Sequence, residues 1–220
     1  MLAPELVNIL VPAFLPCTGL EAECSQAKWD PKNGHIPRGF TGAEASLNDI
    51  QVILVTAEPG DPHPKEFYPE NEKPQQLMEK TSRYTYECLE SNKDLFHRNV
   101  RYFINLIYPT MPFYEQMRRV WITDAYLCSA VTEGGRVQLT AEQECVRRYL
   151  EPELNILHNR PIVVFGRKAQ MRIKRCVSDA DLKKEMIEAW SLAPPGCNFS
   201  GAKSSWKHAS EEVLKRINKS

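Results

Sequence analysis

The sequence predicts an α/β domain, because short apolar runs alternate with segments of helical spacing. The β-branched run from Ile50 to Val55 is typical of a strand buried on both faces of a parallel sheet. Further strands are predicted at 120–127, 161–165 and 189–192. Because helical segments separate the strands, we expect one four-stranded, mostly parallel sheet with helices on both faces, and a single domain over residues 1–220.

Apolar residues at helical spacing predict the elements that connect and follow the strands. These helices are expected at 75–107, 141–157, 167–175, 179–186 and 206–217. Residues 1–45 form an N-terminal segment that precedes the first strand. Ligands of parallel sheets bind beyond the carboxyl ends of the strands. Four loops are expected to converge there: 56–64, 124–128, 166–169 and 194–196.

The composition is that of an ordinary soluble protein. Of the 220 residues 42% are hydrophobic and 25% charged, which excludes collagen-like, disordered and disulfide-miniprotein classes. Lys plus Arg and Asp plus Glu both number 28, so the net charge of zero argues against broad, non-specific binding to phosphates. The apolar start from Leu6 to Leu15 has no basic leader, and no apolar run is long enough to span a bilayer. We therefore expect a cytoplasmic monomer that does not bind membranes.

Two carboxyl groups stand at strand ends. Glu58 lies in a rigid Pro-Gly loop after the first strand, where it is either a general base that orients water or a solvated loop residue. Asp124 interrupts the apolar second strand near its end. Such a carboxyl group is either paired within the core or faces a ligand.

Seven cysteines in a chain without an export signal favour thiols or metal ligands over disulfides. Cys17 and Cys24 form a C-x6-C pair, and Cys128 and Cys145 form a C-x16-C pair. Four such thiolates suit an iron–sulfur cluster or a structural zinc ion. The remaining three, Cys88, Cys176 and Cys197, have no pairing pattern.

The order of these motifs resembles the uracil-DNA glycosylase superfamily, and most closely its iron–sulfur branch of the family 4 and family 5 type. The family's Gly-Glu-Ala-Pro-Gly loop is similar to 56–60 in this chain, and its Ile-Thr-Asn-Val-Val-Lys-Cys strand to 122–128. Its Glu-x-x-x-Cys helix with Tyr-Leu and Glu-Leu is similar to 142–154, and its Leu-Gly-Arg-x-Ala turn to 164–169. The likeness runs from Cys17 to the C-terminus.

The resemblance implies a structural [4Fe-4S] cluster held by Cys17, Cys24, Cys128 and Cys145. The N-terminal pair departs from the family's C-x2-C spacing. It also implies hydrolysis of the N-glycosidic bond of uracil or a related damaged base that has been flipped out of DNA, as in base excision repair. In this interpretation Glu58 positions the attacking water.

Two departures from the family concern the reaction. The family's His-Pro-Ser motif falls at Pro194, Pro195 and Gly196, so proline replaces the histidine that stabilises the leaving group. Asp124 replaces the asparagine that reads the base, and an ionised carboxylate accepts hydrogen bonds without donating any. A changed base preference is expected.

The resemblance also places residues around the base and along the DNA. The base pocket is expected to include Ala57, Pro59, Gly60 and Asp124, with a stacking ring from Phe67, Tyr68 or Tyr84. DNA contacts are expected from Arg167, Lys168, Arg172, Lys174, Arg175 and the loop 198–203, including Lys203.

Three functions stay open from the sequence. The first is a glycosylase with altered base preference. The second is a catalytically weak or inactive member that binds DNA or a partner through the same cleft. The third is a protein whose cysteines hold structural zinc and whose cleft serves another purpose.

Overall fold

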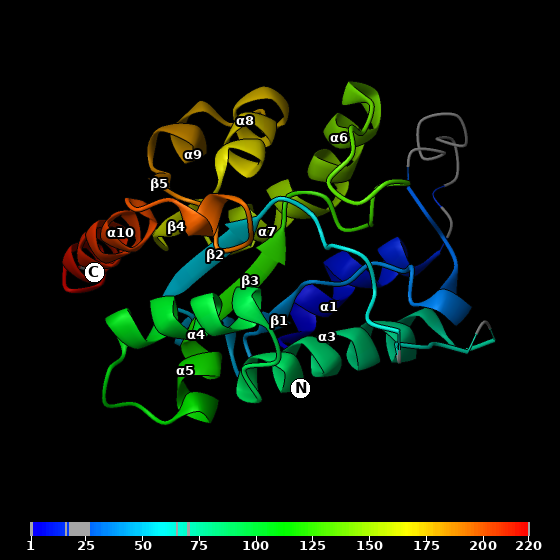
Figure 1. Ribbon diagram of the computed structural model, residues 1–220, viewed down its shortest axis with the longest axis horizontal. Coiled ribbons are helices and arrows are strands. Elements are labelled where there is room, and N and C mark those ends of the chain that lie inside the picture. The colour runs from blue at the N-terminus through cyan, green and yellow to red at the C-terminus, as the bar shows by residue number, and fades with distance from the viewer. Residues whose placement is uncertain (1, 16, 18–26, 65, 70, 220) are drawn as a thin grey trace.

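The architecture is a mixed five-stranded sheet with helices on both faces (Figure 1), seen in a computed structural model that describes residues 2–15, 17, 27–64, 66–69 and 71–219. The strands are β1 (Thr41–Gly42), β2 (Val52–Thr56), β3 (Val120–Asp124), β4 (Ile162–Phe165) and β5 (Ile187–Ala189). The α/β class predicted from the sequence is confirmed.

The strand order is β1-β3-β2-β4-β5. The last four form a parallel set, and β1 pairs antiparallel with the edge of β3. The predicted count of four strands was wrong, because a two-residue strand that contains a glycine has no periodic pattern to read. The last strand also lies earlier than the predicted 189–192.

The α-helices are α1 (Pro4–Leu10), α3 (Pro74–Glu90), α4 (Leu95–Ile107), α5 (Phe113–Arg119), α6 (Leu139–Cys145), α7 (Glu151–Ile156), α8 (Arg167–Cys176), α9 (Ala180–Lys184) and α10 (Ala202–Ile217). Short 3-10 turns are η1 (Val11–Phe14), η2 (Pro31–Asn33), η3 (Leu47–Asp49) and η5 (Gly196–Asn198). None of the described helices is long and apolar enough to cross a membrane.

The segment predicted as one helix over 75–107 is two helices. The first ends at Glu90, and Asp94 begins the second, because its carboxylate caps α4 by accepting a hydrogen bond from the His97 backbone N–H at 3.0 Å. The predicted helix at 141–157 is continuous but contains a π-helical turn, η4 (Val146–Leu150). Pro152 lacks the N–H that would complete a regular α-helical ladder at this point.

The alternation of side chains on β2 divides the core into two layers. Ile53 and Val55 pack with apolar residues of α1, α7 and α8. Val52 and Leu54 face the opposite layer, with apolar residues of α4 and α10. The central strands are buried on both faces, which explains why they appear as continuous apolar runs and why their ends carry the polar groups.

Candidate active site

The carboxyl ends of β2, β3 and β4 lie at one edge of the sheet because these strands are parallel. Thr56 and Asp124 are register partners at the ends of β2 and β3. The two chains stay together beyond them, since the Ala125 backbone N–H donates to the Thr56 carbonyl at 2.8 Å. Glu58 and Asp124 therefore leave the sheet side by side.

The Glu58 carboxylate is ion-paired on both oxygens. Its Oε2 accepts a hydrogen bond from Arg172 Nη1 at 2.8 Å, and its Oε1 accepts one from Lys168 Nζ. Only 7% of the Glu58 side chain is exposed. Both cations belong to α8, where a spacing of four residues puts them on the same face. Glu58 is thus an enclosed, paired carboxylate and differs from a solvated loop residue.

Arg172 connects Glu58 to a second enclosed carboxylate. The Arg172 side chain has no exposed surface, and its Nη2 donates to Glu142 Oε1 at 2.9 Å. Arg175 donates from the opposite side, with Nη2 2.7 Å from Glu142 Oε2. The prediction that Arg172 contacts DNA at the surface was wrong, because buried carboxylates occupy its guanidinium.

Lys168 ties the loop after β3 to Glu58. Its ammonium group also donates to the carbonyls of Gly134 at 3.1 Å and Gly135 at 2.9 Å. These carbonyls and Glu58 match the three donors of an ammonium group. The Lys168 side chain is 37% exposed and is the more accessible of the two Glu58 cations, whereas the neighbouring Arg167 is fully on the surface.

Among the residues that the structure describes, none forms a direct ion pair with Asp124. Its Oδ1 accepts a hydrogen bond from the Thr56 hydroxyl, and the residue is 2% exposed. The pKa of Asp124 is raised to about 7, first because burial disfavours the charged form and also because the Glu58 charge repels a second negative charge. The hydrogen bond from Thr56 opposes this shift. Asp124 therefore holds its proton to a higher pH than an ordinary aspartic acid does.

Gly39 makes room for Asp124, a contact that the sequence did not indicate. Gly39 has φ +87°, and a Cβ atom there would lie 2.0 Å from Asp124 Oδ2. Both the left-handed backbone and the missing side chain are thus required. The one signal in the sequence was a glycine after an arginine, which is too common to interpret.

Arg38 is a buried cation that also escaped prediction. Its Nη1 donates to the Gly34 carbonyl at 3.0 Å, and its Nη2 donates to the carbonyl of Gly60. Its Nε lies 3.8 Å from Glu66 Oε1. Arg38 therefore holds the loop that follows Glu58 against the segment that carries Glu66.

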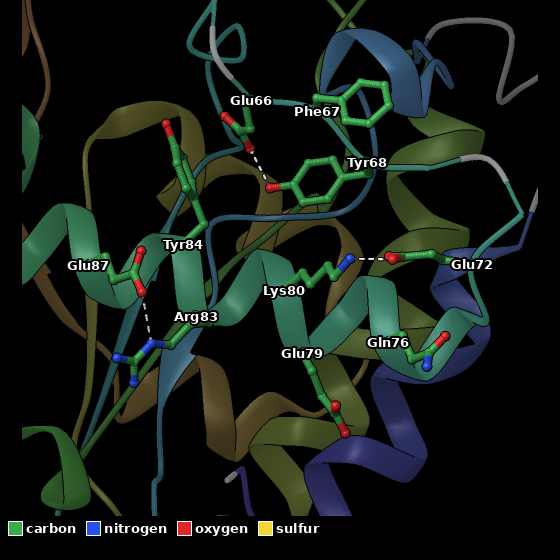
Figure 2. Close-up of a pocket in the computed structure, with 10 residues that line it drawn as sticks. All are labelled: Glu66, Phe67, Tyr68, Glu72, Gln76, Glu79, Lys80, Arg83, Tyr84 and Glu87. Atoms are coloured by element: carbon green, nitrogen blue, oxygen red, sulfur yellow. Dashed lines mark hydrogen bonds and ion pairs between the residues drawn. The ribbon is translucent and has the colours of Figure 1, made fainter.

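The three aromatic candidates for base stacking lie together, but away from Glu58 and Asp124. Phe67, Tyr68 and Tyr84 line a groove of about 670 Å³ beside α3, which Figure 2 shows. Neither Glu58 nor Asp124 lines it. Its other walls carry mainly charged side chains, namely Glu66, Glu72, Gln76, Glu79, Lys80, Arg83 and Glu87. The structure does not bring Phe67 and the paired carboxyl groups into one cavity.

The loop from Pro194 to Gly196, where the resemblance places the His-Pro-Ser motif, follows β5 at the same sheet edge. Its Pro194-Pro195 bond is cis. Gly196 packs closely on Ser191, since a Cβ at Gly196 would lie 2.7 Å from Ser191 Cβ. The carbonyl of Leu192 accepts a hydrogen bond from the Asn99 amide at 2.8 Å, which anchors the loop to α4.

Three of the four predicted metal ligands act electrostatically on the buried phenol of Tyr149. The pKa of the Tyr149 phenol is raised by burial first and then by the thiols of Cys17, Cys145 and Cys128. Cys24 lies outside the described residues. Within the part of the chain that the structure describes, no group of three or more His, Cys, Asp or Glu side chains is arranged to hold a metal ion. The thiol side chains of Cys17, Cys128 and Cys145 are donors of the kind that an iron–sulfur cluster or a zinc ion takes, but their described positions do not form a ligand set.

Comparison with known proteins adds no assignment: no protein-family model matches the chain, and no curated protein matches it.

Proposed function

We propose that this protein is a DNA glycosylase that hydrolyses the N-glycosidic bond of uracil or a related damaged base. The observation that carries the proposal is that two enclosed carboxyl groups, Glu58 just beyond β2 and Asp124 at the end of the adjacent β3, occupy the carboxyl edge of a parallel sheet, where such folds bind ligands. The first is paired with two cations, and the second is a buried group whose pKa is raised by burial. Two carboxyl groups in such different environments suit a base and an acid in one site.

In the proposed reaction the bond from the sugar C1′ to the base nitrogen breaks, and its electron pair leaves with the base. Water adds its oxygen to C1′ and passes a proton to the Glu58 carboxylate, which Lys168 and Arg172 hold in place. Protonated Asp124 donates a hydrogen bond to a carbonyl of the base. Lys168, the more exposed cation, supplies positive charge for the departing base anion. The histidine of the His-Pro-Ser motif would have this role, but Pro194 stands in its place.

The test is excision from oligonucleotides, single- and double-stranded, that carry uracil, hypoxanthine, xanthine or an oxidised pyrimidine, followed by alkaline cleavage of abasic sites. We expect product from at least one base and a loss of a hundredfold or more in Glu58→Gln, roughly the contribution of a general base. Glu79→Gln, a change on the outer face of α3, is the matched control and should retain full activity. Unchanged activity of Glu58→Gln would remove Glu58 from the mechanism.

One observation favours a second candidate, a catalytically inactive member that binds DNA or a partner. Both Glu58 oxygens are occupied by cations and Asp124 is enclosed, so the two carboxyl groups meet a substrate only after these contacts open. Retained DNA binding with no product from any base in the panel would establish this second function instead.

We also propose that Cys17, Cys24, Cys128 and Cys145 bind a structural [4Fe-4S] cluster, with zinc as the alternative. When bound, the group cross-links the N-terminal segment to the loop after β3. Protein purified without air should be brown and contain iron and sulfide, and Cys128→Ser should lose both, while Cys197→Ser should retain them. A colourless protein that contains zinc would overturn the cluster in favour of the alternative metal.

A further inference from the structure

Two large aromatic side chains are exposed on the same sheet edge as Glu58. Trp190 is 45% exposed and Phe199 is 57% exposed, and their ring centroids lie 5.0 Å apart at an interplanar angle of 44°. Both belong to the orange segment that joins β5 to α10 in Figure 1. An exposed tryptophan packed against an exposed phenylalanine forms an apolar surface patch, and such patches are typical of binding sites.

The backbone beneath these rings is fixed by α10. The Trp190 N–H donates to Ser205 Oγ at 3.1 Å, and Trp206 Nε1 donates to the Trp190 carbonyl at 2.9 Å. The Phe199 carbonyl accepts from the Ala202 N–H at 3.0 Å. The two rings are therefore presented to solvent by a rigid support, which reduces the entropy lost when a ligand binds.

The ring pair lies within reach of the candidate active site. Trp190 directly follows β5, which is separated from β2 by β4 alone. Neighbouring strands are about 4.8 Å apart, so the ends of β5 and β2 are separated by about 10 Å. A DNA strand with roughly 3.4 Å between charges covers that distance in about three nucleotides.

The charge around the rings favours a nucleic acid. Lys203 and Lys207 are exposed on the first turns of α10, and the first turn has no acidic residue to offset the positive end of the helix. The groove beside α3 is also aromatic, but it is lined by four glutamates against Lys80 and Arg83. The first surface therefore carries exposed positive charge, whereas acidic side chains outnumber basic ones in the second.

We propose that Trp190 and Phe199 stack on an unpaired nucleobase next to the damaged one, so that the substrate is single-stranded DNA. This inference rests on the proposed function, which supplies the DNA partner. It adds that the site prefers single-stranded to double-stranded DNA. Every base has a face that stacks on an aromatic ring, and this face is available in a single strand and covered in a duplex.

Undamaged DNA tests the proposal without chemistry. Binding is measured by the fluorescence anisotropy of a dye-labelled single-stranded oligothymidylate and of a dye-labelled duplex of the same length. We expect tighter binding of the single strand, and Trp190→Ala and Phe199→Ala should each weaken that binding by about fivefold to a hundredfold. Trp190→Phe should retain most of the affinity because it keeps a ring.

Tyr114→Ala is the matched control, because Tyr114 is also 57% exposed but lies on α5, which enters β3 at the opposite sheet edge. The affinity of Tyr114→Ala for the single strand should equal that of the unaltered protein. Equal affinity for single strand and duplex, or unchanged binding in folded Trp190→Ala and Phe199→Ala, would overturn the proposal even if base excision is found. Conversely, ring-dependent binding without base excision would retain this surface and reject the glycosylase.

Discussion

Glu58 lies just beyond β2 and Asp124 ends the neighbouring β3, yet the protein holds their carboxyl groups in opposite ways. Glu58 is paired with two cations on α8, whereas Asp124 accepts a hydrogen bond from the Thr56 hydroxyl and feels Arg172 and Arg38 only from a distance. The comparison teaches that burial alone does not decide protonation. A buried carboxylate with a guanidinium partner stays in an ion pair, while one without such a partner retains its proton to higher pH.

The largest effect is expected from removing the cation that this comparison depends on. Arg172→Met leaves the Glu58 and Glu142 carboxylates without their shared buried partner. Breaking a buried ion pair costs about 3 to 5 kcal/mol, so the free energy of unfolding in urea should fall by that amount. Arg175→Met, with a side chain 48% exposed, is the control and should cost about 1 kcal/mol or less. Equal losses in both variants would show that the burial of Arg172 is unimportant.

The second prediction concerns the pH dependence that Asp124 gives to stability. The pKa of Asp124 in the folded protein, about 7, lies above its ordinary value of 3.8, so the folded state binds the proton more tightly. Its stabilising contribution is present below pH 4 and is lost as the pH rises towards 7. The difference of about three units between these two pKa values corresponds to about 4 kcal/mol in the free energy of unfolding. Asp124→Asn should remove that part of the decline and be more stable than the unaltered protein at pH 8 in urea unfolding.

Glu153 is the control for this titration. It is fully buried, accepts a hydrogen bond from Trp121 Nε1 at 2.8 Å, and has its pKa raised to about 8 chiefly by burial. It therefore also destabilises the protein as the pH rises, over a range that extends above that of Asp124. Asp124→Asn should leave this later decline in place, and Glu153→Gln should remove it. If the unfolding free energy of Asp124→Asn falls with pH as much as that of the unaltered protein, Asp124 is ionised over the whole pH range.

A third prediction separates backbone strain from contact. Gly39→Ala places a methyl group against Asp124 at a positive φ, and should cost about 2 to 3 kcal/mol. Gly134→Ala is the matched control, since Gly134 also has a positive φ but nothing within 4 Å of its added Cβ. It should cost about 1 kcal/mol. The same loss of unfolding free energy in both would show that the fit between Gly39 and Asp124 contributes nothing.

The smallest effect on stability is expected at Lys168. Its ion pair with Glu58 is partly exposed, so Lys168→Met should lower the unfolding free energy by about 1 kcal/mol or less. It should nevertheless release the turn at Gly134 and Gly135, which amide hydrogen exchange would detect as faster exchange there. Lys174→Met, which breaks a surface pair with Glu188, should leave that turn unchanged.

Local patterns were sufficient to predict the parallel strands and the two carboxyl groups at their ends. Buried strands need continuous apolar runs, so Ile50 to Val55 could be recognised without knowing its neighbours. The two-residue β1 and the helix α5 had no such run and were missed. The boundary at Asp94 was missed because a single capping residue inside a long helical pattern is a weak signal.

The sequence by itself determined that Glu58 follows one buried strand and that Asp124 lies near the end of another, because strand period and strand ends are local properties. Only the tertiary structure decided which groups surround them. Arg172 lies 114 residues from Glu58 along the chain, and the basic pattern of α8 was equally consistent with a solvated surface. Whether a charge faces solvent or a buried partner depends on how distant segments pack, since the desolvation cost and the compensating ion pair both arise only when they meet.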